Sequence, residues 1–186
     1  GRVFEQINRD IQSGDFSNLP FSVAAKAKTI ICGVGTEIYT LNNQGNYVLD
    51  LGWQRILDQS GFKEEALKFT DDDGLITKNI IDIAQGIVGY DLELAAQEIE
   101  KNTSFKKSMW GSCSQLNVSE GDLRNAFLQA FSENGIDIDK IEITVSIQTA
   151  KIAIDLTPKG SNFKANKEYA CMYLSLIHIS EPTRLG

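Results

Sequence analysis

The hydrophobic and polar positions over residues 29–39 predict two strands joined by a tight turn. An apolar run at 29–32 stops at the Gly-Val-Gly segment 33–35, and apolar residues resume after Thr36 and Glu37. Glycine adopts backbone angles that side chains disfavour, so we expect the turn to hold Thr36 and Glu37 out at a strand end. Strand ends commonly carry the ligand sites of α/β proteins, which makes both residues site candidates.

The flanking segments alternate between helical and extended patterns. Apolar residues at helical spacing predict an amphipathic helix over 3–11, and a short helix or turn at 24–28 leads into the first strand. Polar residues 42–46 predict a hairpin loop, with a returning strand at 47–49. A further helix begins near Trp53 and ends at Gly61.

The middle of the chain carries weaker patterns. Segments 62–69 and 92–99 are predicted as helices, and the acidic run 71–74 between them is predicted as a solvated turn because it lacks the alternating ligands of a calcium loop. Segment 75–90 fits either a helix or a strand.

The pattern is clearer from residue 105 onward. Segment 105–110 predicts a strand that places Lys106 and Lys107 on opposite faces. Ser119 and Asp122 have capping-box spacing, so a helix is expected to begin there and to end at Gly135. We expect its apolar face to cover a sheet, and the residues of that face are Leu123, Ala126, Phe127, Ala130 and Phe131.

Strict alternation predicts the sheet itself. Apolar and polar residues alternate over 141–147 and again over 151–156, and the short connection favours an antiparallel hairpin, with the 105–110 strand as a third member. A strand, a helix and two more strands make an open-faced α+β sandwich. After Pro158 the chain is expected to enter a helix that carries Lys164 and Asn166.

Composition narrows the function classes. The chain has 186 residues and a net charge of −7, with no basic stripe, so nucleic acid is excluded as an expected partner. No apolar run approaches the roughly 20 residues of a membrane span, and no signal-peptide pattern opens the chain, so no membrane is expected and the cytoplasm is the expected compartment. Three cysteines without a Cys-x-x-Cys pair predict buried free thiols rather than disulfides or zinc ligands.

The ends of the chain are unusual. The chain opens on Gly1 without an initiator Met, and residues 175–186 read like a translated sequencing adapter, so we set them apart from the fold. That tail contains His178, the single histidine. Without it the chain has carboxylate, lysine and hydroxyl chemistry only.

Two motifs admit more than one interpretation. Gly33-Val-Gly35 is not a dinucleotide fingerprint, because Ile38 stands where the third glycine is required and a hairpin follows. Lys164 after Gly160 is either a phosphate anchor at a helix start or an ordinary surface lysine. Glu37 taken alone is either a structural acceptor or a site residue.

Several segments together resemble the sucrose-phosphate phosphatase branch of the haloacid dehalogenase-like phosphatases. They are Gly-Val-Gly-Thr-Glu-Ile-Tyr at 33–39, Phe105-Lys106, and Asp155-Leu-Thr-Pro158 running into Ser161-Asn162 and Lys164-Ala-Asn166. The resemblance covers most of residues 1–170, with a poor match over 62–101. It implies an α/β fold: an incomplete Rossmann-like phosphatase core at 1–50 and 157–174, an inserted α+β open-faced sandwich cap at 51–156, and an artefactual tail at 175–186.

The resemblance also implies an activity. The family hydrolyses a sugar phosphate such as sucrose 6-phosphate through an aspartyl-phosphate, with Mg²⁺ as cofactor. We expect both aspartates and the metal ligands outside this chain, so the chain alone is expected to be inactive. Lys164 matches the family's phosphate-contacting lysine and is the catalytic candidate. The substrate-binding candidates are Gly35, Thr36, Glu37, Lys106 and Asn166.

This sequence departs from the family pattern around the lysine. Phe163 separates Asn162 from Lys164, and Ala165 replaces the expected glycine. Two alternatives therefore stay open: a phosphatase of the same superfamily that acts on another phosphosugar or metabolite, and a non-catalytic α+β binding module.

Overall fold

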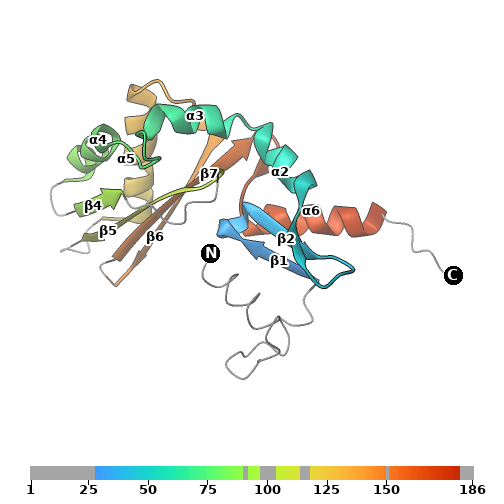
Figure 1. The fold of residues 1–186 in the computed structure, drawn as a ribbon. Helices are drawn as coiled ribbons and strands as arrows, with labels where there is room; N and C mark the ends of the chain where they lie inside the picture. Colours follow the sequence, from blue (N-terminus) through green and yellow to red (C-terminus); the bar gives the residue numbers. More distant parts are fainter. Residues whose placement is uncertain (1–27, 90–91, 97–103, 114–117, 150, 181–186) are drawn as a thin grey trace.

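The computed structural model describes residues 28–89, 92–96, 104–113, 118–149 and 151–180, and in this part the chain is a mixed α/β protein with two antiparallel sheets (Figure 1). The α/β class is therefore confirmed. The elements are β1 (Thr29–Cys32), η2 (Gly33–Gly35), β2 (Glu37–Leu41), β3 (Tyr47–Leu49), α2 (Leu51–Asp58), α3 (Phe62–Phe69), α4 (Lys78–Val88), β4 (Leu92–Ala96), β5 (Lys107–Cys113), α5 (Glu120–Glu133), η3 (Ile138–Lys140), β6 (Ile141–Gln148), β7 (Lys151–Gly160), β8 (Phe163–Lys164) and α6 (Lys167–Ser180).

The smaller sheet has the strand order β1-β2-β3, as the hydrophobic pattern predicts. Ile31 pairs with Ile38, and Tyr39 pairs with Leu49. Asn42 closes the loop between β2 and β3, because its Oδ1 accepts hydrogen bonds from the backbone N–H groups of Gln44 and Asn46, both at 2.9 Å. An Asn side chain that accepts from nearby backbone stabilises such turns.

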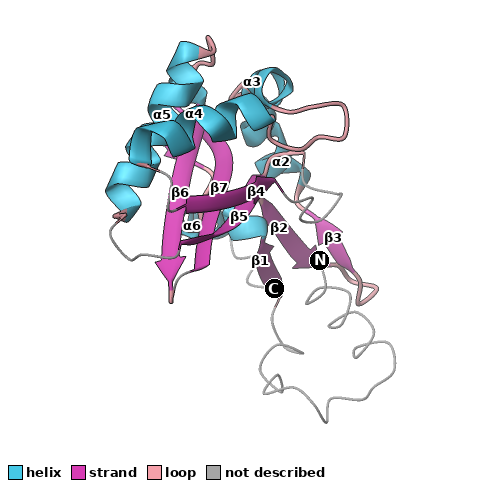
Figure 2. Cartoon of the chain, turned by 90° about the vertical axis from the view of Figure 1, so that its left-hand side faces the viewer, coloured by secondary structure: helices cyan, strands magenta, loops and turns pink. Residues whose placement is uncertain are grey.

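The larger sheet has the order β4-β5-β7-β6, and β8 pairs with the end of β7. The hairpin predicted from the alternating segments is confirmed, with Ile143 opposite Leu156 and Ile147 opposite Ile152. Figure 2 shows α3, α4 and α5 together on one side of this sheet. In the described part of the chain, none of these three helices lies on the opposite face of the sheet, which is called the open face below.

The core lies between the larger sheet and these helices. All five residues of the predicted apolar face of α5 are buried, and so are Ile152, Ile154 and Leu156 on β7. Ser119 caps α5, since its hydroxyl accepts from the N–H of Asp122 at 3.0 Å, which confirms the predicted helix start.

Local signals explain the α2–α4 segment. Asp50 caps α2 by accepting from Trp53 N at 2.9 Å, and Gly61, with φ 73°, separates α2 from α3. Asp71 Oδ1 accepts from the N–H groups of Asp73 and Leu75, which confirms the predicted turn. Segment 75–90, which the pattern left undecided, contains α4.

The helix predicted over 92–99 is wrong where the structure describes it. Residues Leu92–Ala96 form β4, which pairs with β5 so that Leu94 lies opposite Gly111. Leu, Glu and Ala favour helices, but local propensity is a weak preference that strand pairing overrides. Residues 97–99 lie outside the described part.

Other boundaries also differ from the prediction. β5 begins at Lys107, so Lys106 precedes the strand. Lys164 lies in β8 and Asn166 just before α6, not inside the expected helix. α6 continues to Ser180, into the tail that we set apart. The helix predicted over 3–11 and most of segment 24–28 lie outside the described residues.

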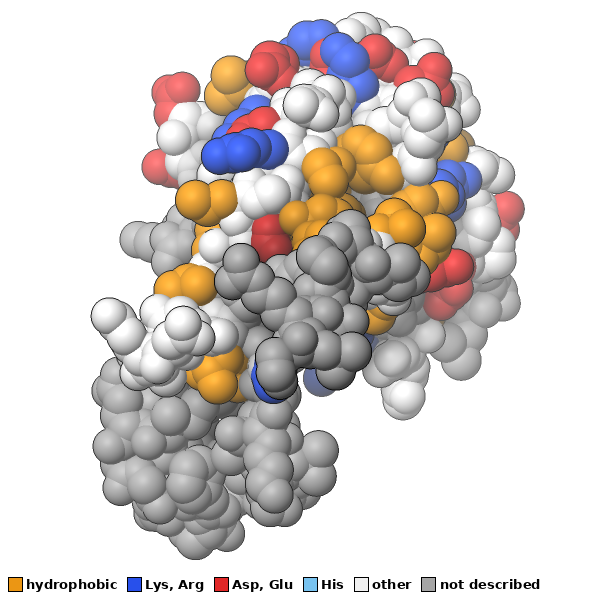
Figure 3. Space-filling model, turned by 90° about the vertical axis from the view of Figure 1, so that its right-hand side faces the viewer, with side chains coloured by type: hydrophobic (Ala, Val, Ile, Leu, Met, Phe, Trp, Pro, Cys, Tyr) orange, Lys and Arg blue, Asp and Glu red, His pale blue; other side chains and the backbone are white. Residues whose placement is uncertain are grey.

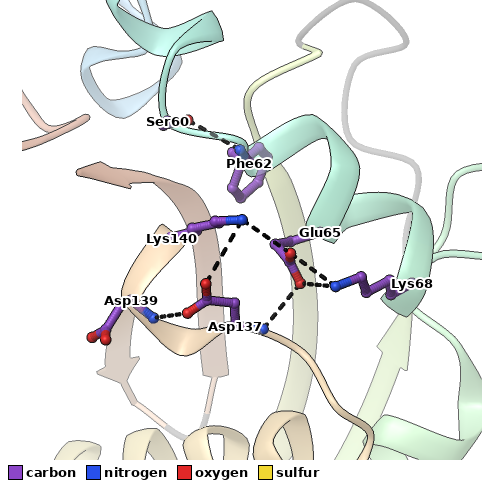
Figure 4. Close-up of polar contacts among 7 residues, drawn as sticks. All are labelled: Ser60, Phe62, Glu65, Lys68, Asp137, Asp139 and Lys140. Carbon is purple, nitrogen blue, oxygen red and sulfur yellow. Dashed lines mark hydrogen bonds and ion pairs between the residues drawn. The ribbon is translucent and has the colours of Figure 1, made fainter. Parts of the chain in front are cut away.

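A buried carboxylate joins α3 to η3 (Figure 4). Glu65 is 3% exposed, and it accepts hydrogen bonds from Lys68 Nζ at 2.7 Å and from the N–H of Asp137 at 3.0 Å. Lys140 Nζ lies 3.5 Å from the other Glu65 oxygen. Burial raises the pKa of Glu65, but these hydrogen bonds and charges outweigh it and leave the pKa below its usual value. Both Glu65 oxygens have protein partners, so this carboxylate holds α3 to the segment that contains η3.

The surface combines charged and apolar areas. Figure 3 shows hydrophobic side chains gathered on one face. The exposed large apolar residues of the small sheet and the helices beside it are Leu41, Val48, Leu51, Met172 and Leu176. Cys171 is exposed, so the prediction of buried thiols is wrong there. Within the described ranges, none of the helices has the length and apolar character needed to cross a membrane.

Candidate functional site

The glycine turn between β1 and β2 has an unusual backbone. Gly33, Val34 and Gly35 have φ values of 57°, 62° and 105°. A β-branched residue such as Val34 rarely adopts a positive φ, and such strain is found preferentially at functional sites. Thr36 holds the turn, since its N–H and its hydroxyl both donate to Gly33 O, at 3.2 and 2.8 Å.

Gly35 lies directly against the start of α6. A Cβ built on Gly35 would collide with the backbone of Asn166 and Lys167. Trp53 completes this junction from α2, because its indole N–H donates to Gly35 O at 3.0 Å. The close approach explains the glycine, and it brings two of the predicted site residues, Gly35 and Asn166, into contact.

Thr36 is fully buried, so the expectation that the turn holds it out for a ligand is wrong. Its hydroxyl bonds to Gly33, and its carbonyl accepts from Gln54 Nε2 at 3.0 Å. Packing of α2 against the turn causes this burial. Glu37, the next residue, begins β2 opposite Cys32 and is partly exposed.

Asn166 caps α6, because its Oδ1 accepts from the N–H of Tyr169 at 2.9 Å. One turn further along, Tyr173 donates to Asp50 Oδ1 at 2.9 Å, and its ring lies 5.1 Å from that of Trp53. Burial, followed by the bond to Asp50 and its charge, raises the pKa of Tyr173 to about 12. α6 is thereby fixed to α2 and to the glycine turn.

Lys164 forms an ion pair with Glu142 of the larger sheet. Lys164 Nζ donates to Glu142 Oε1 at 3.1 Å, and 41% of the lysine side chain is exposed. The other carboxylate oxygen, Glu142 Oε2, is buried and has no hydrogen-bond partner within the described residues. A buried carboxylate oxygen without a donor is costly, so this atom is a potential acceptor for a ligand hydroxyl.

Lys106 lies on the open face of the same sheet. Its Nζ is 3.1 Å from Asp155 Oδ1, which also accepts from the Ser108 hydroxyl at 2.6 Å. Lys107 faces the other side, where its Nζ approaches Gly74, as the opposite-face prediction required. Lys106 and Lys164 are thus each neutralised by a carboxylate that projects from a sheet strand.

The candidate residues therefore form two groups. Gly35, Thr36, Glu37 and Asn166 lie in or beside the junction of the glycine turn with the start of α6. The side chains of Lys164 and Lys106 are instead paired with Glu142 and Asp155 of the larger sheet. Sequence reasoning missed Glu142 and the pairing role of Asp155. Their positions in alternating strands fixed only the face on which they lie, and the partner depends on strand order.

No group of three or more His, Cys, Asp or Glu side chains in the described part of the chain is arranged to hold a metal ion. No family model, curated protein or solved structure matches the chain. The fold therefore gives the structural class alone: the described part of the chain is a mixed α/β protein with two antiparallel sheets.

Proposed function

We propose that this chain is part of a phosphatase that hydrolyses a sugar phosphate, with a Rossmann-like core interrupted by an α+β cap. The observation that carries the proposal is the contact between Gly35 and Asn166. These residues belong to the two segments that resemble core motifs of sucrose-phosphate phosphatases, and the open-faced sheet lies between them in sequence.

The candidate side chains suit both the phosphoryl group and the sugar of such a substrate. Lys164 pairs with Glu142 but stays 41% exposed, so its ammonium group has further N–H donors for a phosphoryl group, where a lysine acts as a point charge. Lys106, Glu37 and the unpartnered Glu142 Oε2 supply donors and acceptors for sugar hydroxyls. Gly35, Thr36 and Asn166 act by shaping the junction that positions Lys164. The nucleophile and the Mg²⁺ ligands would lie outside the described residues.

Binding of sucrose 6-phosphate to the full chain, measured by calorimetry, tests the proposal. Lys164→Met should weaken binding roughly tenfold or more, because a charged hydrogen bond is lost. Lys159→Met is the matched control: Lys159 lies opposite Lys164 in the strand pair and pairs instead with Asp139. Equal affinity for sucrose and sucrose 6-phosphate, or equal effects of the two variants, would overturn the assignment.

Glu37→Ala separates sucrose 6-phosphate from other phosphosugars as the substrate. If Glu37 selects the sugar, the variant loses its preference for sucrose 6-phosphate over glucose 6-phosphate while still binding phosphate. An unchanged preference would remove Glu37 from the site.

A non-catalytic binding module is the second candidate. The burial of Thr36 favours it, since that hydroxyl is already used within the turn. A module would bind the unphosphorylated sugar as well as the phosphate ester, and Lys164→Met would leave its affinity unchanged.

A further inference from the structure

An exposed tryptophan lies on the open face of the larger sheet, away from the helices. Trp110 of β5 is 46% exposed, whereas Trp53 is 2% exposed. Tryptophan combines a large apolar ring with an N–H donor, so a half-exposed indole on a sheet surface is suited to contact a ligand.

The strand register places a shallow floor beside the indole. Ala153 of β7 is paired with Trp110 on one side and with Ser146 of β6 on the other. Because the side chain of Ala153 is only a methyl group, the sheet surface between Trp110 and Ser146 is recessed at this position. A pocket of about 550 Å³ lies here, within the size range of small-molecule sites.

Polar groups surround this floor. Ser146, Gln148, Thr149 and Lys151 line the pocket, and Gln148 is paired with Lys151 in the next row of the sheet. Within the described part of the chain, the side chains of Ser146, Gln148 and Lys151 make no hydrogen bond or ion pair. Donors and acceptors are thus available around a flat apolar surface.

We propose that Trp110 and Ala153 form a binding subsite for a neutral sugar ring. A pyranose has an apolar face, which can lie on the indole, and a rim of hydroxyls, which can bond to Ser146, Gln148 and Lys151. The net charge of −7 disfavours a nucleic acid, which would otherwise stack on the same side chain.

This subsite is distinct from the ion-paired lysines. Same-face residues on a strand repeat at about 7 Å, which puts Trp110 about 13 Å from Lys106. The inference does not rest on the proposed phosphatase function, since its ligand needs no phosphate. It would hold equally for a non-catalytic module.

Titration of the full chain with methyl α-glucopyranoside, followed by tryptophan fluorescence, tests the proposal. Trp110 is the accessible reporter, and binding should give a saturable change with a Kd on the order of 1 mM, together with protection from acrylamide quenching. Ala153→Leu places a larger side chain in the recess beside Trp110 but leaves Trp110 itself as the fluorescent reporter. This variant should bind the glucoside roughly tenfold or more weakly. Ser132→Leu, at an exposed position of α5, is the matched control and should bind like the parent.

Three results would overturn the inference. The first is no saturable change, or the same change in Ala153→Leu. The second is tighter binding of adenosine than of the glucoside, measured by calorimetry, which would assign the surface to nucleobases. The third is a dimer, detected by sedimentation, that forms without sugar and protects Trp110 from acrylamide quenching at the same protein concentration. That result would assign the surface to a second copy of the chain.

Discussion

Gly35 and Asn166 are in direct backbone contact, although most of the described chain separates them in sequence. The glycine turn and the start of α6 can approach this closely only because Gly35 has no side chain. Its φ of 105° is also outside the range that L-residues adopt readily. This contact joins the small sheet to the segment that carries Lys164.

Gly35→Ala should therefore destabilise the protein by roughly 3 kcal/mol, because backbone strain adds to a collision that neither partner can relieve. Urea unfolding measures the effect. Gly45→Ala is the control, since Gly45 has φ 80° but nothing lies within 4 Å of its added Cβ. It should cost about 1 kcal/mol, from backbone strain alone. Equal losses would show that the close approach contributes nothing.

Tyr173→Phe should remove a pH dependence of stability at high pH. The folded pKa of Tyr173, about 12, lies above its ordinary value of 10.0. The protonated phenol is therefore favoured in the fold, and this contribution is complete below pH 10 and lost as the pH rises toward 12. Thermal unfolding of parent and variant should show a gap in Tm that narrows over this range. A constant gap would contradict the raised pKa that burial, followed by the bond to Asp50, gives Tyr173.

Glu65→Gln should destabilise the protein by roughly 1–3 kcal/mol at pH 7, because the buried site loses its charge between two lysines. The pKa of Glu65 is lowered, so its contribution is present above pH 4.5 and is lost as the pH falls through the folded pKa. The difference between parent and variant should therefore shrink in acid. Glu64→Gln, at the exposed neighbouring position, should be nearly neutral at both pH values.

Thr149→Asn should stabilise the β6–β7 hairpin by about 0.5–1 kcal/mol. Thr149 has φ 45°, which is unfavourable for a β-branched residue, whereas Asn tolerates this region. Thermal unfolding measures the gain. Thr144→Asn, at an exposed position of β6 in extended conformation, should be neutral or destabilising, and a gain of equal size there would argue against relief of strain.

Where apolar residues recur with a clear helical or strand period, this hydrophobic pattern predicted the secondary structure and the buried face correctly. The alternation in β6 and β7 and the apolar face of α5 correspond to residues that are buried. Local chemistry was equally informative at Ser119, whose side chain caps the helix as its spacing predicted. These features depend on neighbours in sequence, so the chain carries the information locally.

The misplaced elements depend on distant partners. Leu92–Ala96 forms a strand because its backbone pairs with that of β5. Thr36 is buried because α2 packs against the turn. The pairing of Lys164 with Glu142 likewise follows from strand order, which no local pattern reveals.

The sequence by itself thus determined the α/β class, the hairpins β1–β2, β2–β3 and β6–β7, the α5 cap and the residue types available for a site. Only the tertiary structure decided which carboxylate neutralises each lysine, that Gly35 lies against Asn166, and that Trp110 stands beside the low floor at Ala153. The physical reason is range: capping and periodicity act within a few residues, whereas ion pairs, close backbone approach and surface pockets arise between segments that meet only when the chain folds.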